Sequence, residues 1–231
     1  MSEDAPTEKK KKGPSCGCLI LGAILLVLFL GTFLGPIAGP VRPPRESAAM
    51  QTCRQIGLGM FAYANDHGGK YPDGQSSTEV FQKLLDEGYV TDPSIFYVPA
   101  MPGKRKPEPD AKLKPENVGW DVTGGVDRST SDFIPMVFLT GYKVTYAPGT
   151  AAVYIDRSFS APTRTWSEWW AGMPDPITYD GIAVAFKDNS AKFMILKDSS
   201  GTERSVPEFV SKDFVPDGKT YRQLTPDGVA P

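Results

Sequence analysis

The chain has a long run of uncharged, mostly apolar positions near its N-terminus. Residues 13–41 contain no Asp, Glu, Lys, Arg or His, and Leu19 to Leu34 read LILGAILLVLFLGTFL. With its uncharged flanks, a helix over this run is long enough to cross about 30 Å of hydrocarbon. The pattern therefore predicts a single membrane-spanning helix over residues 16–41.

Charges on the two flanks predict the orientation of this helix. Four lysines, residues 9–12, stand directly before it, whereas the following flank carries only Arg42 and Arg45. Because clustered basic residues stay on the cytoplasmic side, we expect residues 1–15 to form a cytoplasmic basic tail and the remaining chain to face outward. The alternative is a cleaved secretory signal, with small residues near positions 37–39.

Apolar positions after the prolines of residues 36–44 follow the period of a helix. From Arg45 they recur at spacings of four and three, and Gly68 and Gly69 end the pattern. The sequence predicts an amphipathic helix that packs inward through one stripe of side chains: Ala49, Cys53, Ile56, Met60 and Tyr63.

A second, shorter helix is predicted after a turn at residues 71–74. Ser77 or Thr78 can cap its start, and Gly88 ends it. An extended piece is expected next, over residues 95–98.

The second half of the chain contains short β-prone runs separated by turn residues. Runs at residues 133–139, 143–147 and 151–155 have the spacing of an antiparallel meander, and residues 181–186 and 191–196 predict a hairpin. Between the two hairpin runs lie Asp and Asn, which tolerate the positive φ of tight turns.

These elements predict an α+β fold class: an N-terminal membrane helix, then an amphipathic helix packed on a small antiparallel β-sheet. We expect the α+β domain to cover residues 42–197. Residues 198–231 are interpreted as a Pro-rich C-terminal extension.

Composition narrows the range of functions. The chain carries 25 Lys and Arg against 27 Asp and Glu, a net charge of −2, which argues against nucleic-acid binding. It has one His and 3 Cys, and it lacks both the G-x-S-x-G setting of a serine nucleophile and a glycine-rich phosphate loop. We therefore expect no enzyme activity, no catalytic residue and no cofactor, with calcium left open.

Two groups of side chains are candidate binding sites. Asp121, Asp127 and Asp132 offer carboxylate oxygens of the kind that calcium prefers, although their spacing matches no EF-hand and a solvated loop is the favoured interpretation. A conspicuous aromatic group suits stacking on a ligand, or else covers a gap between helix and sheet: Arg164, Trp166, Trp169 and Trp170. His67 is interpreted as a polar residue at a helix terminus.

Several segments resemble a known family. They are Arg45-Glu46-Ser47-Ala48, QTCRQIGLGMFAYANDHGGKYPDG, LLDEGYVTDPSIFYVPAMPG and GIAVAFKDNSAKF. Together they look like the type IV pilin-like or type II secretion pseudopilin-like proteins of planctomycete and verrucomicrobial bacteria. The resemblance implies an exported, pilin-type domain on a membrane-anchored helix, with structural or assembly duties and no chemistry.

The chain departs from that family at its N-terminus and in two loops. Pro14 and Cys18 stand where pilins carry a methylatable Phe and a Glu, so the prepilin peptidase motif is lacking. Val98 replaces a usual cysteine, and residues 188–190 replace the family's Asp-Gly-His type of turn.

The expected function is that of a non-catalytic, pseudopilin-like cell-envelope protein that acts through protein contacts, in secretion or pilus-like assembly. It would sit in the bacterial inner membrane by a single pass, with its N-terminus cytoplasmic and its globular domain periplasmic or extracellular. Its expected partners are the membrane and other envelope or pseudopilin-like proteins. The alternative is a periplasmic ligand-binding or enzyme-accessory module.

Overall fold

The structure is a computed structural model that describes residues 45–99, 101, 103–109, 111–155, 181–198 and 204–230. The described residues belong to one compact unit, Pro44–Pro231. The predicted membrane helix and basic tail lie outside the described residues. From Arg45 onward, no described helix combines the length and the apolar character needed to cross a membrane.

The long helix α2 (Arg45–Asp66) confirms the predicted amphipathic helix. Four side chains of the predicted inward stripe are buried, with Cys53, Ile56 and Met60 fully inaccessible to solvent, whereas Tyr63 is only partly buried. These side chains face the sheet formed by β2, β5 and β6, the strands that α2 contacts most. The helix ends where Gly68 and Gly69 adopt positive φ angles, which glycine reaches without steric cost.

The short helix α3 (Ser77–Asp86) confirms the second predicted helix but corrects its cap. Ser76 is the N-cap, because its hydroxyl accepts a hydrogen bond from the backbone N–H of Glu79 at 3.1 Å. Ser77 and Thr78 are instead buried in the first turn. Their hydroxyls donate to main-chain carbonyls of distant segments and tie α3 to the sheet.

The connection from α3 to the sheet contains two 3-10 helices, η2 (Pro93–Phe96) and η3 (Pro115–Asn117). η2 corrects the extended piece predicted at residues 95–98. Asp92 caps it by accepting a hydrogen bond from Ser94 N at 2.8 Å, and Pro93 occupies its first position. A proline at the first helical position costs no hydrogen bond, so this sequence starts a helical turn.

The main sheet has six antiparallel strands in the order β10-β9-β1-β2-β5-β6. The predicted hairpin is confirmed as β5 and β6, with Asn189 at a φ of 64° in the turn. The strands are β1 (Trp120–Gly124), β2 (Pro135–Leu139), β5 (Gly181–Phe186), β6 (Ala191–Ile195), β9 (Arg222–Thr225) and β10 (Gly228–Val229).

A smaller antiparallel sheet has the order β3-β4-β8-β7. It corrects the predicted meander, because β2 and β3 follow each other in the chain yet belong to different sheets. Gly141, at a φ of 98°, turns the chain between them. The strands are β3 (Tyr142–Val144), β4 (Ala152–Tyr154), β7 (Lys197–Asp198) and β8 (Arg204–Val206).

The C-terminal segment corrects the predicted boundary at residue 198. Instead of forming an extension, residues 204–230 supply β8 to the smaller sheet and β9 and β10 to the main one. β9 pairs directly with β1, with Val122 opposite Leu224. The last strands are therefore part of the α+β domain.

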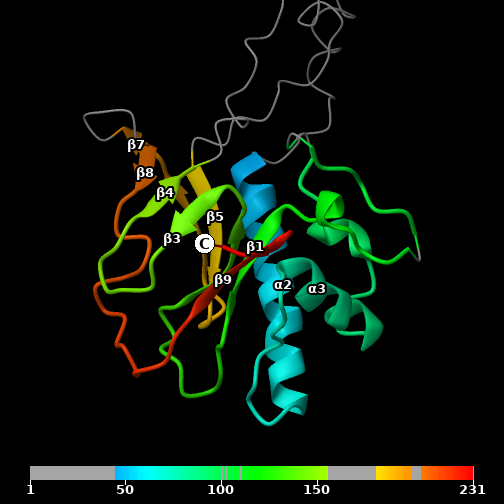
Figure 1. The fold of residues 1–231 in the computed structure, drawn as a ribbon, viewed down its shortest axis with the longest axis horizontal. Helices are drawn as coiled ribbons and strands as arrows, with labels where there is room; N and C mark the ends of the chain where they lie inside the picture. Colours follow the sequence, from blue (N-terminus) through cyan, green and yellow to red (C-terminus); the bar gives the residue numbers. More distant parts are fainter. Residues whose placement is uncertain are drawn as a thin grey trace, which may run out of the picture. The chain divides into compact units, whose positions relative to one another are not determined.

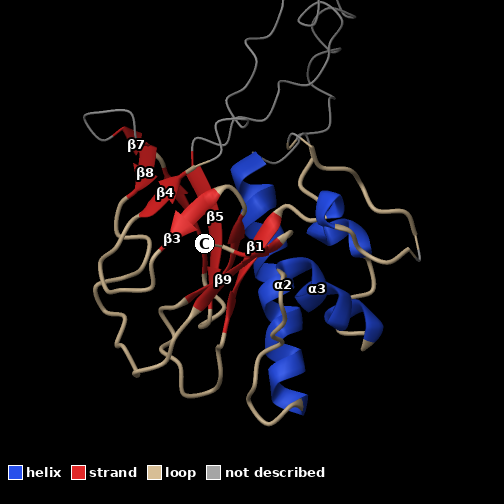
Figure 2. Ribbon diagram, in the orientation of Figure 1, coloured by secondary structure: helices blue, strands red, loops and turns tan. Residues whose placement is uncertain are grey.

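The helices and the smaller sheet lie on opposite faces of the main sheet (Figures 1 and 2). On the helix face, a Cβ added at Gly57 of α2 would lie 3.6 Å from the Cβ of Ala185 on β5. On the other face, the ring of Phe138 on β2 meets that of Phe209, with centroids 5.3 Å apart. The centre of the main sheet is consequently covered on both faces, and its two central strands, β1 and β2, are buried throughout.

Candidate functional site

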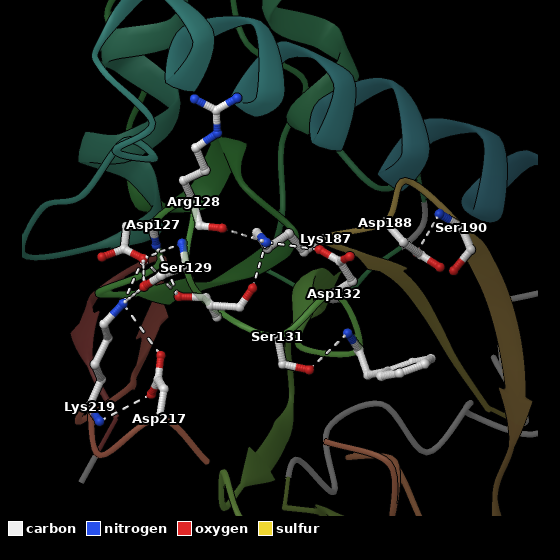
Figure 3. A network of polar contacts seen from close by, with 12 residues as sticks. Asp127, Arg128, Ser129, Ser131, Asp132, Lys187, Asp188, Ser190, Asp217 and Lys219 are labelled. Atoms are coloured by element: carbon white, nitrogen blue, oxygen red, sulfur yellow. Dashed lines mark hydrogen bonds and ion pairs between the residues drawn. The ribbon is translucent and has the colours of Figure 1, made fainter. Parts of the chain in front are cut away.

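A lysine from the C-terminal segment holds the loop between β1 and β2, residues 125–134 (Figure 3). Lys219 Nζ lies 2.6 Å from Asp127 Oδ1 and 2.6 Å from Ser129 Oγ. It also lies 3.4 Å from Asp217 Oδ2. The ammonium group is thus surrounded by oxygen atoms from the loop and from the segment before β9.

A second lysine, Lys187, holds the same loop from the hairpin turn after β5. Its side chain is only 9% exposed. Its Nζ lies 2.8 Å from Asp132 Oδ1, and it donates to the carbonyl oxygens of Thr130 at 2.5 Å and Arg128 at 3.3 Å. The two lysines therefore join the β1–β2 loop to elements that are distant in sequence.

These contacts fix the charge states of the pair formed by Asp127 and Lys219. The hydrogen bond from Lys219 holds the pKa of the Asp127 carboxyl well below its usual range. The same hydrogen bond raises the pKa of Lys219. Both groups stay charged at neutral pH, and the cation at the centre of these oxygens is an ammonium group of the chain itself.

The three aspartates considered as calcium ligands are not brought together. Asp127 contacts Lys219, and Asp132 contacts Lys187. Asp121 lies in β1 and is fully buried, which corrects its assignment to a solvated loop. Within the described ranges, no group of three or more His, Cys, Asp or Glu side chains is placed to hold a metal ion.

The outward side of α2 carries two large apolar side chains one helical turn apart. Leu58 is 46% exposed and Phe61 is 47% exposed. Phe61 also lines a cavity of about 270 Å³ at the end of α2, together with Arg128, Asp132 and Lys187 of the lysine-held loop. Phe61, one member of the exposed apolar pair, thus adjoins the charged network of Figure 3.

His67 forms a terminal contact of α2, as predicted. Its ring stacks on that of Tyr63, with centroids 3.8 Å apart and planes 4° apart, and its Nδ1 lies 2.9 Å from the carbonyl oxygen of Tyr63. Its Nε2 lies 3.3 Å from a carboxylate oxygen of Glu87, at the end of α3. The side chain connects the ends of the two helices.

One predicted site cannot be located in the structure, and two residues of the observed site were not predicted. The group of Arg164, Trp166, Trp169 and Trp170 lies outside the described residues. Lys187 and Lys219 were missed as site residues by sequence reasoning. Lys187 lies between the two predicted hairpin runs, and the partner of Lys219 is 92 positions away, so no local pattern marks either residue as part of a site.

Comparison of the chain with models of protein families, with curated proteins and with solved structures finds no match.

Proposed function

We propose that this chain is a non-catalytic, membrane-anchored, pilin-like protein of the bacterial cell envelope that acts through protein contacts. The membrane anchor is the apolar segment of residues 16–41, and the contacting domain is the α+β unit that follows. In this proposal the chain is related to the pilin-like proteins that its sequence resembles, and its domain lies on the outer side of the inner membrane.

The observation that carries the proposal is the exposed apolar pair on α2. This helix starts at Arg45, directly after the predicted anchor and its prolines in the sequence. Its inner stripe is used in the domain core, yet Leu58 and Phe61 remain about half exposed on its outer side. Contiguous exposed apolar side chains are typical of surfaces that meet a partner.

Four side chains that could take part in catalysis are buried or bound to other groups of the domain, which supports a function in protein contacts. They are Cys53, His67, Lys187 and Lys219. Burial raises the pKa of the Cys53 thiol to about 12, so the thiolate needed for nucleophilic chemistry is scarce at neutral pH. Lys187 and Lys219 are bound to carboxylates in Figure 3. His67 is bound to Glu87.

Photo-cross-linking in living cells tests the proposal. A photoreactive phenylalanine analogue placed at Leu58 or Phe61 is expected to give discrete adducts with envelope proteins. Val215, which is 69% exposed and apolar but lies on the segment between β8 and β9, is the matched control. Adducts from Val215 equal to those from Leu58 and Phe61, or none from the α2 positions, would contradict a contact surface on α2.

A further inference from the structure

A buried carboxyl group lies between the two sheets. Asp121 is on β1, its side chain is on the face turned away from α2, and it is 0% exposed. Its Oδ2 accepts a hydrogen bond of 2.7 Å from Gln223 Nε2. Its Oδ1 is equally buried and makes no hydrogen bond of good geometry within the described part of the chain, and the nearest polar side chain to the carboxyl besides Gln223 is that of Thr140.

Gln223 is the side chain that joins this carboxyl group to the second sheet. It stands on β9 of the main sheet, opposite Thr123 of β1. Its Oε1 accepts a hydrogen bond of 3.0 Å from Val144 N, and its Nε2 donates to the carbonyl oxygen of Tyr142 at 2.5 Å. A single amide therefore holds the main chain of β3 and the carboxyl of Asp121 together.

We propose that Asp121 and Gln223 form a pH-dependent latch between the two sheets, closed while Asp121 is protonated and loosened when it ionises. The closed latch keeps β3 and β4 on the main sheet. The loosened latch lets these strands separate locally and admits water to the carboxylate.

The physical reason is the cost of an unpaired charge away from water. Burying a neutral carboxyl group costs much less free energy than burying a carboxylate that has no water molecule or cation in contact with it. Burial raises the pKa of Asp121 to about 7, and the hydroxyl of Thr140 and the amide of Gln223 oppose this only in part. The latch thus changes state near neutral pH.

The other charged and titratable groups near Asp121 do not offset the free-energy cost of burying its carboxylate. Lys104, from the segment between η2 and η3, favours the carboxylate, while Asp227, from the turn between β9 and β10, disfavours it. Tyr146, after β3, keeps its phenol protonated because burial raises its pKa, and its hydroxyl lies 2.8 Å from Thr123 Oγ1. Burial is the largest influence on the Asp121 carboxyl.

Water has a short path to the latch. A cavity of about 460 Å³ runs between β3 and β9, and Val144, Tyr146 and Gln223 are among the residues that line it. The hydrogen bonds of Gln223 to Val144 N and to the carbonyl oxygen of Tyr142 place β3 close to β9. A modest outward movement of β3 is therefore enough to hydrate the carboxylate.

The direction of the pH effect follows from proton binding. A carboxyl exposed to water has a pKa of about 4, so between about pH 4 and pH 7 the closed state binds more protons than the open state. The closed state is then favoured at the low end of this window and loses its advantage as the pH rises. Above about pH 7 both states are ionised, and the effect becomes constant.

Hydrogen exchange of the full chain in detergent micelles, followed by mass spectrometry from about pH 5 to pH 8, tests the latch. After correction for intrinsic exchange, protection of peptides spanning β3 and β4 should fall by up to about tenfold per pH unit up to about pH 7 and then level off. Peptides from α3, on the other face of the main sheet, are the internal control and should lack this slope.

Asp121→Asn provides the matched variant, because it keeps the shape and the amide partner but cannot ionise. Its β3 and β4 peptides should show no slope in this window. An equal slope in α3, an unchanged slope in Asp121→Asn, or no slope in the natural chain would each overturn the latch. If Asp121→Asn does not fold, the carbon resonance of the Asp121 carboxyl in the natural chain decides: titration near pH 7 supports the latch, and titration near pH 4 contradicts it.

Discussion

Lys219 Nζ lies 2.6 Å from Asp127 Oδ1, so a residue of the C-terminal segment closes the loop between β1 and β2. The two residues are 92 positions apart in the chain. This contact shows why the C-terminal segment belongs to the domain, and it places a positive charge of the protein among oxygens that resemble a cation site.

Removing the charge of Lys219 should change the response of stability to acid. The pKa of Asp127 is depressed in the folded state. Its stabilising contribution is therefore present above the ordinary carboxyl pKa and is lost as the pH falls below about 4. Lys219→Met should be less stable at pH 7 and should lose less stability between about pH 4 and pH 2.

Urea unfolding at several pH values, followed by tryptophan fluorescence, measures this difference. Lys143→Met is the control, because Lys143 is exposed on β3 and no ion pair is found for it among the described residues. Parallel pH profiles for Lys219→Met and the natural protein would show that the Asp127 contact contributes nothing.

Calcium should leave the melting temperature of the natural protein unchanged. Lysine ammonium groups already occupy the centres of the oxygen groups around Asp127 and Asp132, and a divalent cation placed there would be repelled by them. Thermal melts in millimolar calcium and in a chelator are expected to coincide. A reproducible increase of several degrees with calcium would mean that these loops open to bind it.

The inward stripe of α2 should dominate the stability of the helix–sheet contact. Ile56→Ala creates a cavity in the core, and the free energy of unfolding is expected to fall by roughly 3 kcal/mol. Leu58→Ala removes a similar side chain from the exposed side of the same helix and should cost about 0.5 kcal/mol or less. Equal losses in urea unfolding would mean that α2 does not pack on the sheet through this stripe.

Two glycines should respond to alanine in opposite directions. At Gly57 the new methyl group would make an ordinary contact with Ala185, 3.6 Å away, so better helix propensity should add up to about 1 kcal/mol. At Gly181 it would clash with the carbonyl oxygen of Met194 on the paired strand and force β5 and β6 apart. We expect Gly181→Ala to lose roughly 1–3 kcal/mol in the same measurement, and a neutral result there would refute the β5–β6 register.

Local patterns predicted the elements whose burial follows a simple period. α2 and the β5–β6 hairpin were found because Cys53, Ile56 and Met60 repeat at helical spacing and because Asn189 marks a turn. β1 and β9 were missed, since Asp121 and Gln223 are polar side chains at buried positions. Polar groups inside a sheet interrupt the alternation by which strands are recognised.

The polar contacts of the candidate site depend on pairs that are far apart in sequence. Gln223 and Asp121 are 102 positions apart, and Lys187 and Asp132 are 55 apart. Each of these residues taken alone is compatible with a solvated turn. Only the pairing of β9 with β1, and of β5 with β2, brings them into contact.

Membrane fractionation combined with protease access tests whether the segment of residues 16–41 holds the α+β domain outside the inner membrane. With an epitope tag at each terminus, we expect the chain to sediment with membranes. In spheroplasts, protease should remove the C-terminal tag while the N-terminal tag stays protected in the cytoplasm. A soluble domain whose N-terminus begins near residue 40 would show that the segment is cleaved, and a C-terminal tag that resists protease in spheroplasts would show that the domain is not on the outer side.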